Sequence, residues 1–354
     1  MICYNNSMFT PKYQITSKIV NALSRIAEIK NFVESARILP AREVFLRKMT
    51  AIKIAHTSTS IEGNTLEEFE VKKLFEGKSV HASQKEILEV NNYHSALKLI
   101  DRLNKKSSLN INDILQIHKK VIDGLVSPQK AGVFRITPVY IVNTHQNQSD
   151  EVIYTPPKAG DVEKEINSLL NFLDKEKNLH PILRAGLFHY QFETIHPFTD
   201  GNGRVGRLLT LLHLYQSGWG FKKILALEDY YNRDRKKYYS KLNTAATFDQ
   251  RRQASLTEWL EYFVTGFLDE VENIKTQILT VPAVSGAKNI SLSDLELKIV
   301  DFVGTVGKIT LADALDITRE NRRTVQRRLQ RLVKNKILLA RIEGPNSYYE
   351  LNLS

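Results

Sequence analysis

The chain has 354 residues, of which 42% are hydrophobic and 25% are charged, a balance typical of a protein with one or more buried cores and not of a disordered chain. Its single cysteine, Cys3, excludes disulfides and cysteine-rich zinc sites, and no stretch approaches the roughly 18 apolar residues that cross a membrane. A formal net charge of +11 favours anionic ligands, without separating nucleotides from nucleic acids. We therefore expect a cytoplasmic protein that makes no membrane contact.

The first third of the chain is predicted to be helical. Residues 16–55 carry helical periodicity, and residues 83–103 and 110–124 predict two amphipathic helices that begin at favourable capping residues, Ser83 and Asn110. His94 and His118 lie within these two helices. We expect both to be structural, because no acidic or cysteine partner stands at metal-ligand spacing.

The composition changes after Gly132. Residues 133–142, VFRITPVYIV, and 152–157, VIYTPP, are rich in β-branched and aromatic residues and flank a polar tract. This pattern predicts a hairpin with a long loop in an otherwise helical chain. Asp161 is then the expected N-cap of a helix over residues 162–176.

The stretch with the densest chemistry is HPFTDGNGRVGR, residues 196–207. The runs on either side of it, 182–195 and 208–215, have the apolar spacing of buried helices, so the stretch is a polar loop between two core helices. Gly201 and Gly203 let the backbone turn tightly where the second helix begins. The unpaired amides at that helix end attract an anion.

Four side chains complete this loop. Arg204 and Arg207 lie on the first turn of the second helix and offer planar donors suited to phosphate oxygens. Asp200, at the edge of an anion site, makes sense as a ligand of a hard cation such as Mg²⁺ that bridges phosphates. His196 is the one group here able to accept a proton near neutral pH. The set predicts transfer chemistry on a nucleoside polyphosphate. A formal match to the GxGxxG dinucleotide fingerprint is rejected because no β-strand precedes it.

The same stretch resembles the HPFxDGNGRxxR signature of the Fic family, and every fixed position is matched. Close members of that family are protein adenylyltransferases, which move AMP from ATP to a Ser, Thr or Tyr hydroxyl of a protein. The resemblance implies a mainly α fold, a Fic-type helical bundle with a β-hairpin flap, with ATP as substrate and Mg²⁺ as cofactor. The predicted hairpin stands in the place of the flap, which holds a target segment by strand addition. Arg135, at its start, is expected to be structural.

Residue roles follow from the same resemblance. His196 would be the general base on the target hydroxyl, Asp200 would hold Mg²⁺ between the α- and β-phosphates, and Phe198 would anchor the loop from beneath. The residues that would bind the nucleotide are Gly201, Asn202, Gly203, Arg204, Val205, Gly206, Arg207 and Tyr238. For Tyr238, packing on the base and a core position are equally open.

Residues 58–64, STSIEGN, resemble the family's inhibitory motif, [S/T]xxxE[G/N], at the positions Ser58, Glu62 and Gly63. The resemblance implies that Glu62 forms a salt bridge with Arg207 and so blocks productive binding of the γ-phosphate. This is physically sensible, because a carboxylate competes with phosphate for the same guanidinium. A simpler interpretation is helix capping by Asn64 or Thr65, which does not exclude inhibition.

Residues 279–291 predict a linker to a separate C-terminal module. Beyond it the pattern predicts three helices and then two strands, at 293–303, 310–315, 318–334, 337–342 and 347–351. This order resembles a winged helix-turn-helix domain. Between residues 318 and 341, nine Lys or Arg stand against one acid, Glu320. That density fits DNA binding, with a solvated basic face on a protein-docking module as the alternative.

We therefore predict an N-terminal helical region over 1–82, a Fic catalytic domain over 83–278, the linker over 279–291 and a winged helix-turn-helix domain over 292–354. The expected activity is nucleotidyl transfer: AMP moves from ATP to a hydroxyl of a target protein, or of the protein itself, under inhibition by Glu62. One open alternative is a DNA-binding regulator whose Fic core senses nucleotide without turnover. Another is a Fic enzyme that uses a different nucleotide donor or removes AMP. A homodimer is compatible with the sequence, which carries no interface signal.

Overall fold

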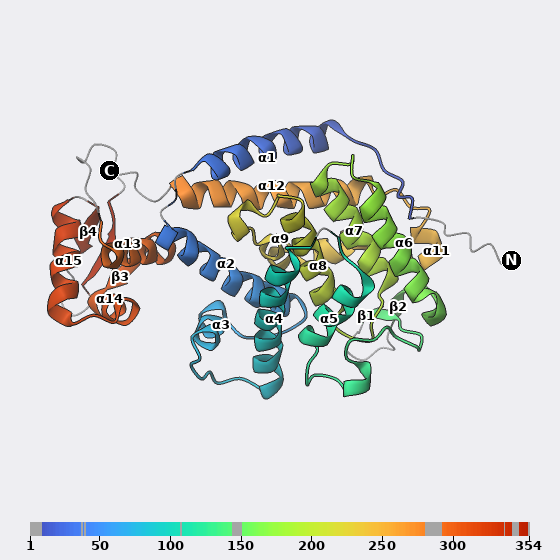
Figure 1. The fold of residues 1–354 in the computed structure, drawn as a ribbon, viewed down its shortest axis with the longest axis horizontal. Helices are drawn as coiled ribbons and strands as arrows, with labels where there is room; N and C mark the ends of the chain where they lie inside the picture. Colours follow the sequence, from blue (N-terminus) through green and yellow to red (C-terminus); the bar gives the residue numbers. More distant parts are fainter. Residues whose placement is uncertain are drawn as a thin grey trace. The chain divides into compact units, whose positions relative to one another are not determined.

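The computed structural model divides the chain into two compact units (Figure 1). The larger unit comprises Met1–Lys30 and Thr50–Val271, and the smaller one Asn31–Met49 and Glu272–Ser354. The structure describes residues 9–36, 38, 40–106, 108–143, 151–279, 292–335, 337–341 and 347–352. The predicted linker over 279–291 lies almost wholly outside the described residues, and the four-segment division of the chain stays a prediction.

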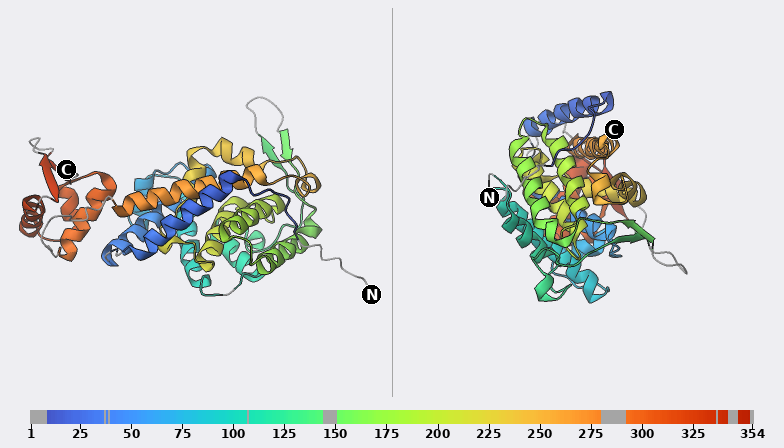
Figure 2. Two further views of the ribbon diagram at one scale, coloured as in Figure 1. Left: turned by 90° about the horizontal axis from the view of Figure 1, so that it is seen from above. Right: turned by 90° about the vertical axis from the view of Figure 1, so that its right-hand side faces the viewer.

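The larger unit is mainly helical (Figure 2). The helices up to Leu279, three of which (α1, α2 and α12) also contribute residues to the smaller unit, are α1 (Ser17–Ser35), α2 (Pro40–Ile61), α3 (Glu68–Phe75), α4 (Gln84–Leu103), α5 (Ile111–Val121), α6 (Val162–Lys175), α7 (Pro181–Ile195), α8 (Asn202–Gln216), α9 (Leu227–Arg233), α10 (Arg235–Leu242), α11 (Phe248–Arg251) and α12 (Thr257–Leu279). Among the described helices, none has the length and apolar character needed to span a bilayer.

Helices α7 and α8 lie at the centre of this unit (Figure 1). Almost every residue of α7 is buried, which follows from a sequence that is apolar on nearly all sides. α7 packs against α6 and α8, and α8 also packs against α4 and α5. Because both helices are packed in the core, the two ends of the loop between α7 and α8 are fixed in place.

Three helices begin at the residues that the sequence predicted as their N-caps. Ser83 and Asn110 each form a capping box with the third residue of the helix that follows, as predicted. Asp161 stands at the N-cap position of α6, but its side chain makes no capping hydrogen bond. The predicted N-cap position of Asp161 is therefore confirmed, without a side-chain hydrogen bond.

The segment after α2 is capped differently from the prediction. The N-cap of α3 is Glu67, whose backbone N–H donates to Glu70 Oε2 at 3.0 Å. Neither Asn64 nor Thr65 begins this helix. The Asn64 side chain instead bonds within the segment and to α4: its Oδ1 accepts from Leu66 N at 3.1 Å, and its Nδ2 donates to Glu89 Oε2 at 2.9 Å.

The predicted hairpin is present but short. Strands β1 (Ile141–Asn143) and β2 (Glu151–Tyr154) pair antiparallel and project from the larger unit (Figure 2). Residues 133–140 are not a strand, because the chain there bonds to the α7–α8 loop instead: Arg135 N donates to Pro197 O at 3.0 Å. Residues 144–150, most of the predicted polar tract, lie outside the described residues.

The smaller unit holds three C-terminal helices and a three-stranded antiparallel sheet of order β3-β5-β4. These elements are α13 (Asp294–Val306), β3 (Lys308–Thr310), α14 (Leu311–Thr318), α15 (Arg322–Lys334), β4 (Leu338–Arg341) and β5 (Tyr348–Leu351). The sequence did not predict β3, because three residues are too few to show an alternating pattern. Residues 342–346, between β4 and β5, and Lys336 lie outside the described residues.

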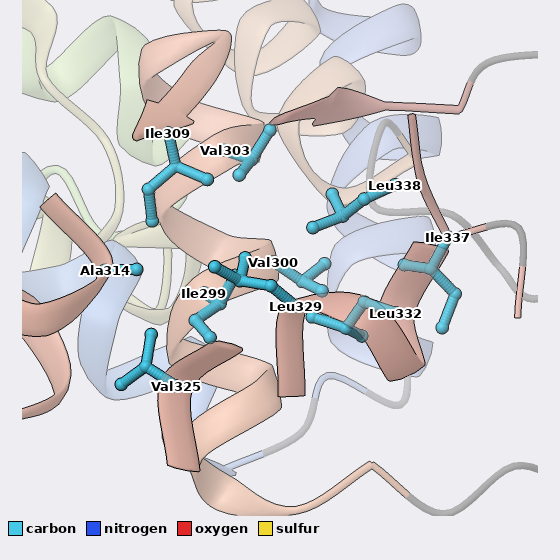
Figure 3. Close-up of a cluster of buried hydrophobic side chains, with 10 residues drawn as sticks. All are labelled: Ile299, Val300, Val303, Ile309, Ala314, Val325, Leu329, Leu332, Ile337 and Leu338. Carbon is cyan, nitrogen blue, oxygen red and sulfur yellow. The ribbon is translucent and has the colours of Figure 1, made fainter. Parts of the chain in front are cut away.

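This unit has its own apolar core, shown in Figure 3. Side chains from the three helices point toward one another and toward the sheet; the buried ones are Ile299, Val300, Val303, Ile309, Ala314, Val325, Leu329, Leu332, Ile337 and Leu338. The three helices and the two predicted strands lie where the sequence placed them. Their assignment to the winged helix-turn-helix class stays a prediction.

Candidate active site

The loop between α7 and α8 begins and ends with left-handed backbone. His196 follows α7 with φ 50°, and Gly201 precedes α8 with φ 81°. Positive φ costs little for glycine but is unfavourable for a residue with a Cβ, so the contacts of the loop must hold His196 in this conformation. His196 N donates to Phe192 O at 3.0 Å, which ties the imidazole-bearing residue to the end of α7.

Arg135 fixes the first part of the loop. Its Nε donates to His196 O at 2.8 Å, and its Nη2 donates to Pro157 O at 2.6 Å. The side chain is buried and bonds only to backbone carbonyls in these contacts. This is the structural role that the sequence predicted for Arg135.

His118, on α5, fixes the other end of the loop. Its Nδ1 accepts from Gly132 N at 3.0 Å, so the proton is assigned to Nε2, which donates to Asp200 O at 3.2 Å. Its ring stacks on Phe198 with 3.6 Å between ring centroids. Burial lowers the pKa of His118 to about 4, which keeps the ring neutral. His118 is therefore structural, as predicted, and it positions the backbone beside Asp200.

The Asn202 side chain bonds to the backbone of the loop. Its Oδ1 accepts from Phe198 N at 2.8 Å, and its Nδ2 donates to Phe198 O at 2.9 Å. Phe198 is fully buried beneath the loop. The Asn202 amide therefore closes the loop on itself, and its expected contact with phosphate stays a prediction.

Arg204 and Asp200 form an ion pair at the start of α8. Arg204 Nη2 lies 3.0 Å from Asp200 Oδ1, and Glu89 Oε1 lies 3.8 Å from Arg204 Nη1. The Arg204 side chain is buried, whereas that of Asp200 is half-exposed. Two further buried guanidinium nitrogens of Arg204, Nε and Nη1, have no hydrogen-bond partner in the described structure.

The same pair bears on metal binding. Among the described residues, no three His, Cys, Asp or Glu side chains gather as a metal site. Asp200 therefore fits a hard cation such as Mg²⁺ only if nucleotide phosphates and water complete its coordination, which is the usual way that Mg²⁺ binds.

Arg207 is held from α2. Its Nε donates to Ser58 Oγ at 2.8 Å, and its Nη2 donates to Ser58 O at 2.9 Å and to Glu62 Oε1 at 2.7 Å. The Arg207 side chain is only 1% exposed. Ser58 and Glu62 thus occupy the donors that sequence reasoning assigned to phosphate.

Gly203 allows this approach. A Cβ at position 203 would collide with the Glu62 carboxylate and would press on Arg207 Nη1. The glycine leaves the space in which Glu62 lies against the first turn of α8. Gly63, two residues after the end of α2, has φ 96° and turns the chain away from this contact.

His196 is the titratable group at the loop. Burial lowers its pKa to about 4, so the imidazole is neutral at physiological pH. A neutral imidazole has one unprotonated ring nitrogen, which is able to take up a proton.

Three other predicted nucleotide contacts face inward. Val205 is fully buried, and a Cβ at Gly206 would collide with the buried Glu193 carboxylate. Tyr238 is also buried, and its OH bonds to His189 Nε2 at 2.8 Å. Of the two positions left open for Tyr238, the structure gives the core. Its neighbour Tyr239 is 46% exposed and is therefore accessible to a ligand.

Arg235 is a contact that sequence reasoning missed. Its Nη2 donates to Ser60 Oγ at 2.7 Å, which joins the start of α10 to the end of α2. A basic residue in the run RDRKKYY carries no signal of a partner 175 residues away. Ser58, Ser60 and Glu62 therefore all contact arginines of α8 or α10.

The larger unit is thus a helical domain in which the N-terminus of the buried helix α8 meets the loop that carries His196. Arg204 and Arg207 lie on the first two turns of the same helix. Residues 108–214 match the Fic/DOC family, and the chain therefore contains a Fic domain.

Named relatives extend the similarity beyond that domain. The chain is 37% identical over 201 residues to Protein adenylyltransferase Fic of Nematostella vectensis, covering 55% of this chain and 43% of the relative. It is 30% identical over 252 residues to Protein adenylyltransferase fic-1 of Caenorhabditis elegans, covering 67% of this chain and 45% of the relative. The chain thus spans less than half the length of these relatives.

Solved structures share the fold. A Fic family protein from Desulfovibrio desulfuricans matches with a TM-score of 0.67 and 26% identity, over 98% of this chain and 99% of that one. Fic-1 from Caenorhabditis elegans matches with a TM-score of 0.60 and 25% identity, over 74% of this chain and 73% of that one. The first match extends over both units, and the mainly helical Fic fold predicted from the sequence is confirmed.

Proposed function

We propose that the protein transfers AMP from ATP to a hydroxyl side chain of a protein substrate, which is a foreign protein or the chain itself. The observation that carries this proposal is the neutral, half-buried imidazole of His196 beside the N-terminus of α8. That helix end, with Arg204 and Arg207, suits a polyphosphate. The relatives named as protein adenylyltransferases support the same chemistry.

In this reaction the substrate hydroxyl oxygen attacks the α-phosphorus of ATP, and His196 takes up the hydroxyl proton. A new oxygen–phosphorus bond forms, the bond from the α-phosphorus to the bridging oxygen breaks, and diphosphate leaves with the electron pair. Asp200 would hold Mg²⁺ through its exposed carboxylate, and the bound ion would neutralise phosphate charge. Arg135 and His118 keep the loop backbone in place during the step.

Glu62 would restrain this activity. Its carboxylate lies 2.7 Å from Arg207 Nη2, in the position where a phosphate oxygen of the nucleotide would meet that guanidinium. A carboxylate and a phosphate cannot both use the same donors. The protein would then hold ATP in a productive geometry only when Glu62 moves away or is removed.

The neutral base argues against the alternative of a regulator that senses nucleotide without turnover, since a sensor has no use for a proton acceptor. The absence of a cysteine pair suits action in the reducing cytoplasm. DNA, predicted as a ligand of residues 318–341, would bind outside this site.

The test uses purified Glu62→Gly protein with Mg²⁺ and ATP labelled on either the α- or the γ-phosphate, alone and with a cell extract. The Glu62→Gly/His196→Ala double variant is the matched control. We expect protein-bound label from the α position only, lost in the control. Label from the γ position would identify a phosphotransferase instead, and no label from either position would refute nucleotidyl transfer from ATP.

A further inference from the structure

The outer face of α15 carries a line of polar side chains. Arg323, Arg327, Gln330 and Lys334 are spaced i, i+4, i+7 and i+11, which places them on one side of the helix, and all four are exposed. The opposite side, with Val325, Leu329 and Leu332, points into the core of the unit (Figure 3). We call these four residues the outer stripe.

The other two arginines in the middle of α15 have an internal use. Arg331 Nη1 lies 3.0 Å from Glu296 Oε2, and Arg328 Nη1 lies 3.5 Å from Glu296 Oε1. Glu296 is completely buried and also accepts from Ser293 N at 2.8 Å, where it caps α13. Arg328 and Arg331 therefore neutralise a buried carboxylate and have a structural role. Arg323, Arg327 and Lys334 are exposed instead.

The basic residues of the outer stripe have no acidic partner among the residues that the structure describes. α15 contains no Asp or Glu, and within the described residues neither Arg323, Arg327 nor Lys334 has an ion pair. Arg322 and Arg323 also stand on the first turn, where the helix dipole disfavours positive charge. A merely solvated face would mix both signs of charge. An uncompensated basic stripe at a positive helix end instead suits an anionic ligand.

The dimensions fit one such ligand. From Arg323 to Lys334 the stripe extends about 17 Å at a rise of about 1.5 Å per residue, and a helix about 10–12 Å across enters a major groove about 12 Å wide. α15 follows α14 after a three-residue turn in which Arg319 has φ 55°, which is the order of a helix-turn-helix. Its second helix, α15, is the one that exposes the outer stripe to solvent. Arginine and glutamine are also the side chains that bond guanine and adenine edges.

From these features we propose that the C-terminal unit binds double-stranded DNA through the outer stripe, with α15 in the major groove. Arg323, Arg327 and Gln330 face the base edges, and Lys334 contacts the phosphate backbone. Arg328 and Arg331 take no direct part. This assignment is independent of AMP transfer, which uses residues of the other unit.

The test measures fluorescence anisotropy of a labelled duplex of mixed sequence with the full chain, at several salt concentrations between about 50 and 200 mM. The variant is Arg323→Gln/Arg327→Gln. The matched control, Lys85→Gln/Lys120→Gln, removes the same charge from exposed positions of the larger unit. We expect the variant to bind about tenfold or more weakly at every salt concentration, because it loses two base-edge contacts. The control should retain most of the affinity.

Equal binding by variant and control would overturn the proposal, as would no duplex binding at low salt. A single strand or poly-L-glutamate that competes as well as the duplex would also overturn it, and the latter would indicate an acidic protein partner. AMP transfer measured on the same proteins in the Glu62→Gly background separates the two proposals. The stripe variant should keep that activity whether or not DNA binds.

Discussion

The arginines at the α7–α8 loop and those of the outer stripe of α15 differ in burial and in pairing. Arg207 is buried and its donors are taken by Ser58 and Glu62, whereas Arg323 is exposed and, in the described part of the chain, without an ion pair. A guanidinium that carries its own counter-ion is restrained until that counter-ion leaves. One without a counter-ion is available to a ligand at once. If both proposals hold, the first site is controlled from within the chain and the second surface is open to a ligand at all times.

The largest expected effect is the loss of the base in the loop. In the Glu62→Gly background, His196→Ala should lower AMP transfer by about 100- to 10,000-fold, the usual contribution of general base catalysis. ATP binding measured by calorimetry should change little, because His196 does not provide phosphate donors. Loss of ATP binding together with activity would make His196 a binding residue instead.

Loop positioning should have a smaller effect. His118→Leu removes two hydrogen bonds to backbone, one of them to Asp200 O. We expect kcat in the Glu62→Gly background to fall about tenfold, the equivalent of roughly one net hydrogen bond, and the Mg²⁺ concentration for half-maximal rate to rise. His118→Gln, which keeps polar groups at the position, is the control and should recover part of both values. An unchanged Mg²⁺ requirement in His118→Leu would limit His118 to general stability.

The paired and unpaired arginines of α15 should contribute differently to the stability of the C-terminal unit. Glu296→Gln should lower the free energy of unfolding of the C-terminal unit by about 1–3 kcal/mol, because it leaves Arg328 and Arg331 without their buried carboxylate. Arg323→Gln should change it by no more than about 0.5 kcal/mol, in the stabilising direction, since it removes a charge that opposes the helix dipole. Thermal unfolding of the two variants followed by circular dichroism checks this. Equal destabilisation would contradict the division into structural and exposed arginines.

The pH dependence of activity should reflect the burial of His196. A folded pKa of about 4, below the ordinary value of 6.5, means that the base is neutral above about pH 5 and becomes protonated only as the pH falls further. The acid limb of kcat/KM for the Glu62→Gly protein should therefore lie below pH 5. A limb centred near 6.5 would show that the imidazole is exposed to solvent in the working enzyme.

The sequence predicted most of this site because its chemistry is contiguous. Residues 196–207 lie on one loop and one helix turn, so their meeting needed no tertiary information. The pairing of Glu62 with Arg207, 145 residues apart, came only through family resemblance, and the contact of Arg235 with Ser60 was missed. No periodicity reports a contact between distant segments.

Side-chain direction was harder to predict than position. Tyr238 and Asn202 stand at the expected places, but one side chain bonds to His189 in the core and the other to the backbone of Phe198. Both outcomes depend on which neighbour offers a partner, which only the folded structure supplies. Strand β3 was missed for a related reason, since its identity depends on pairing with β5 rather than on its own three residues.

The central claim is that Glu62 restrains the site by occupying Arg207. The most direct measurement is the initial rate of AMP incorporation from α-labelled ATP by the wild-type protein, by Glu62→Gly and by Glu67→Gly, a control that removes a nearby exposed carboxylate. We predict that Glu62→Gly raises the rate by about tenfold or more, in line with the loss of a charge-assisted hydrogen bond, while Glu67→Gly stays near the wild type. A folded Glu62→Gly protein with an unchanged or lower rate would contradict the account.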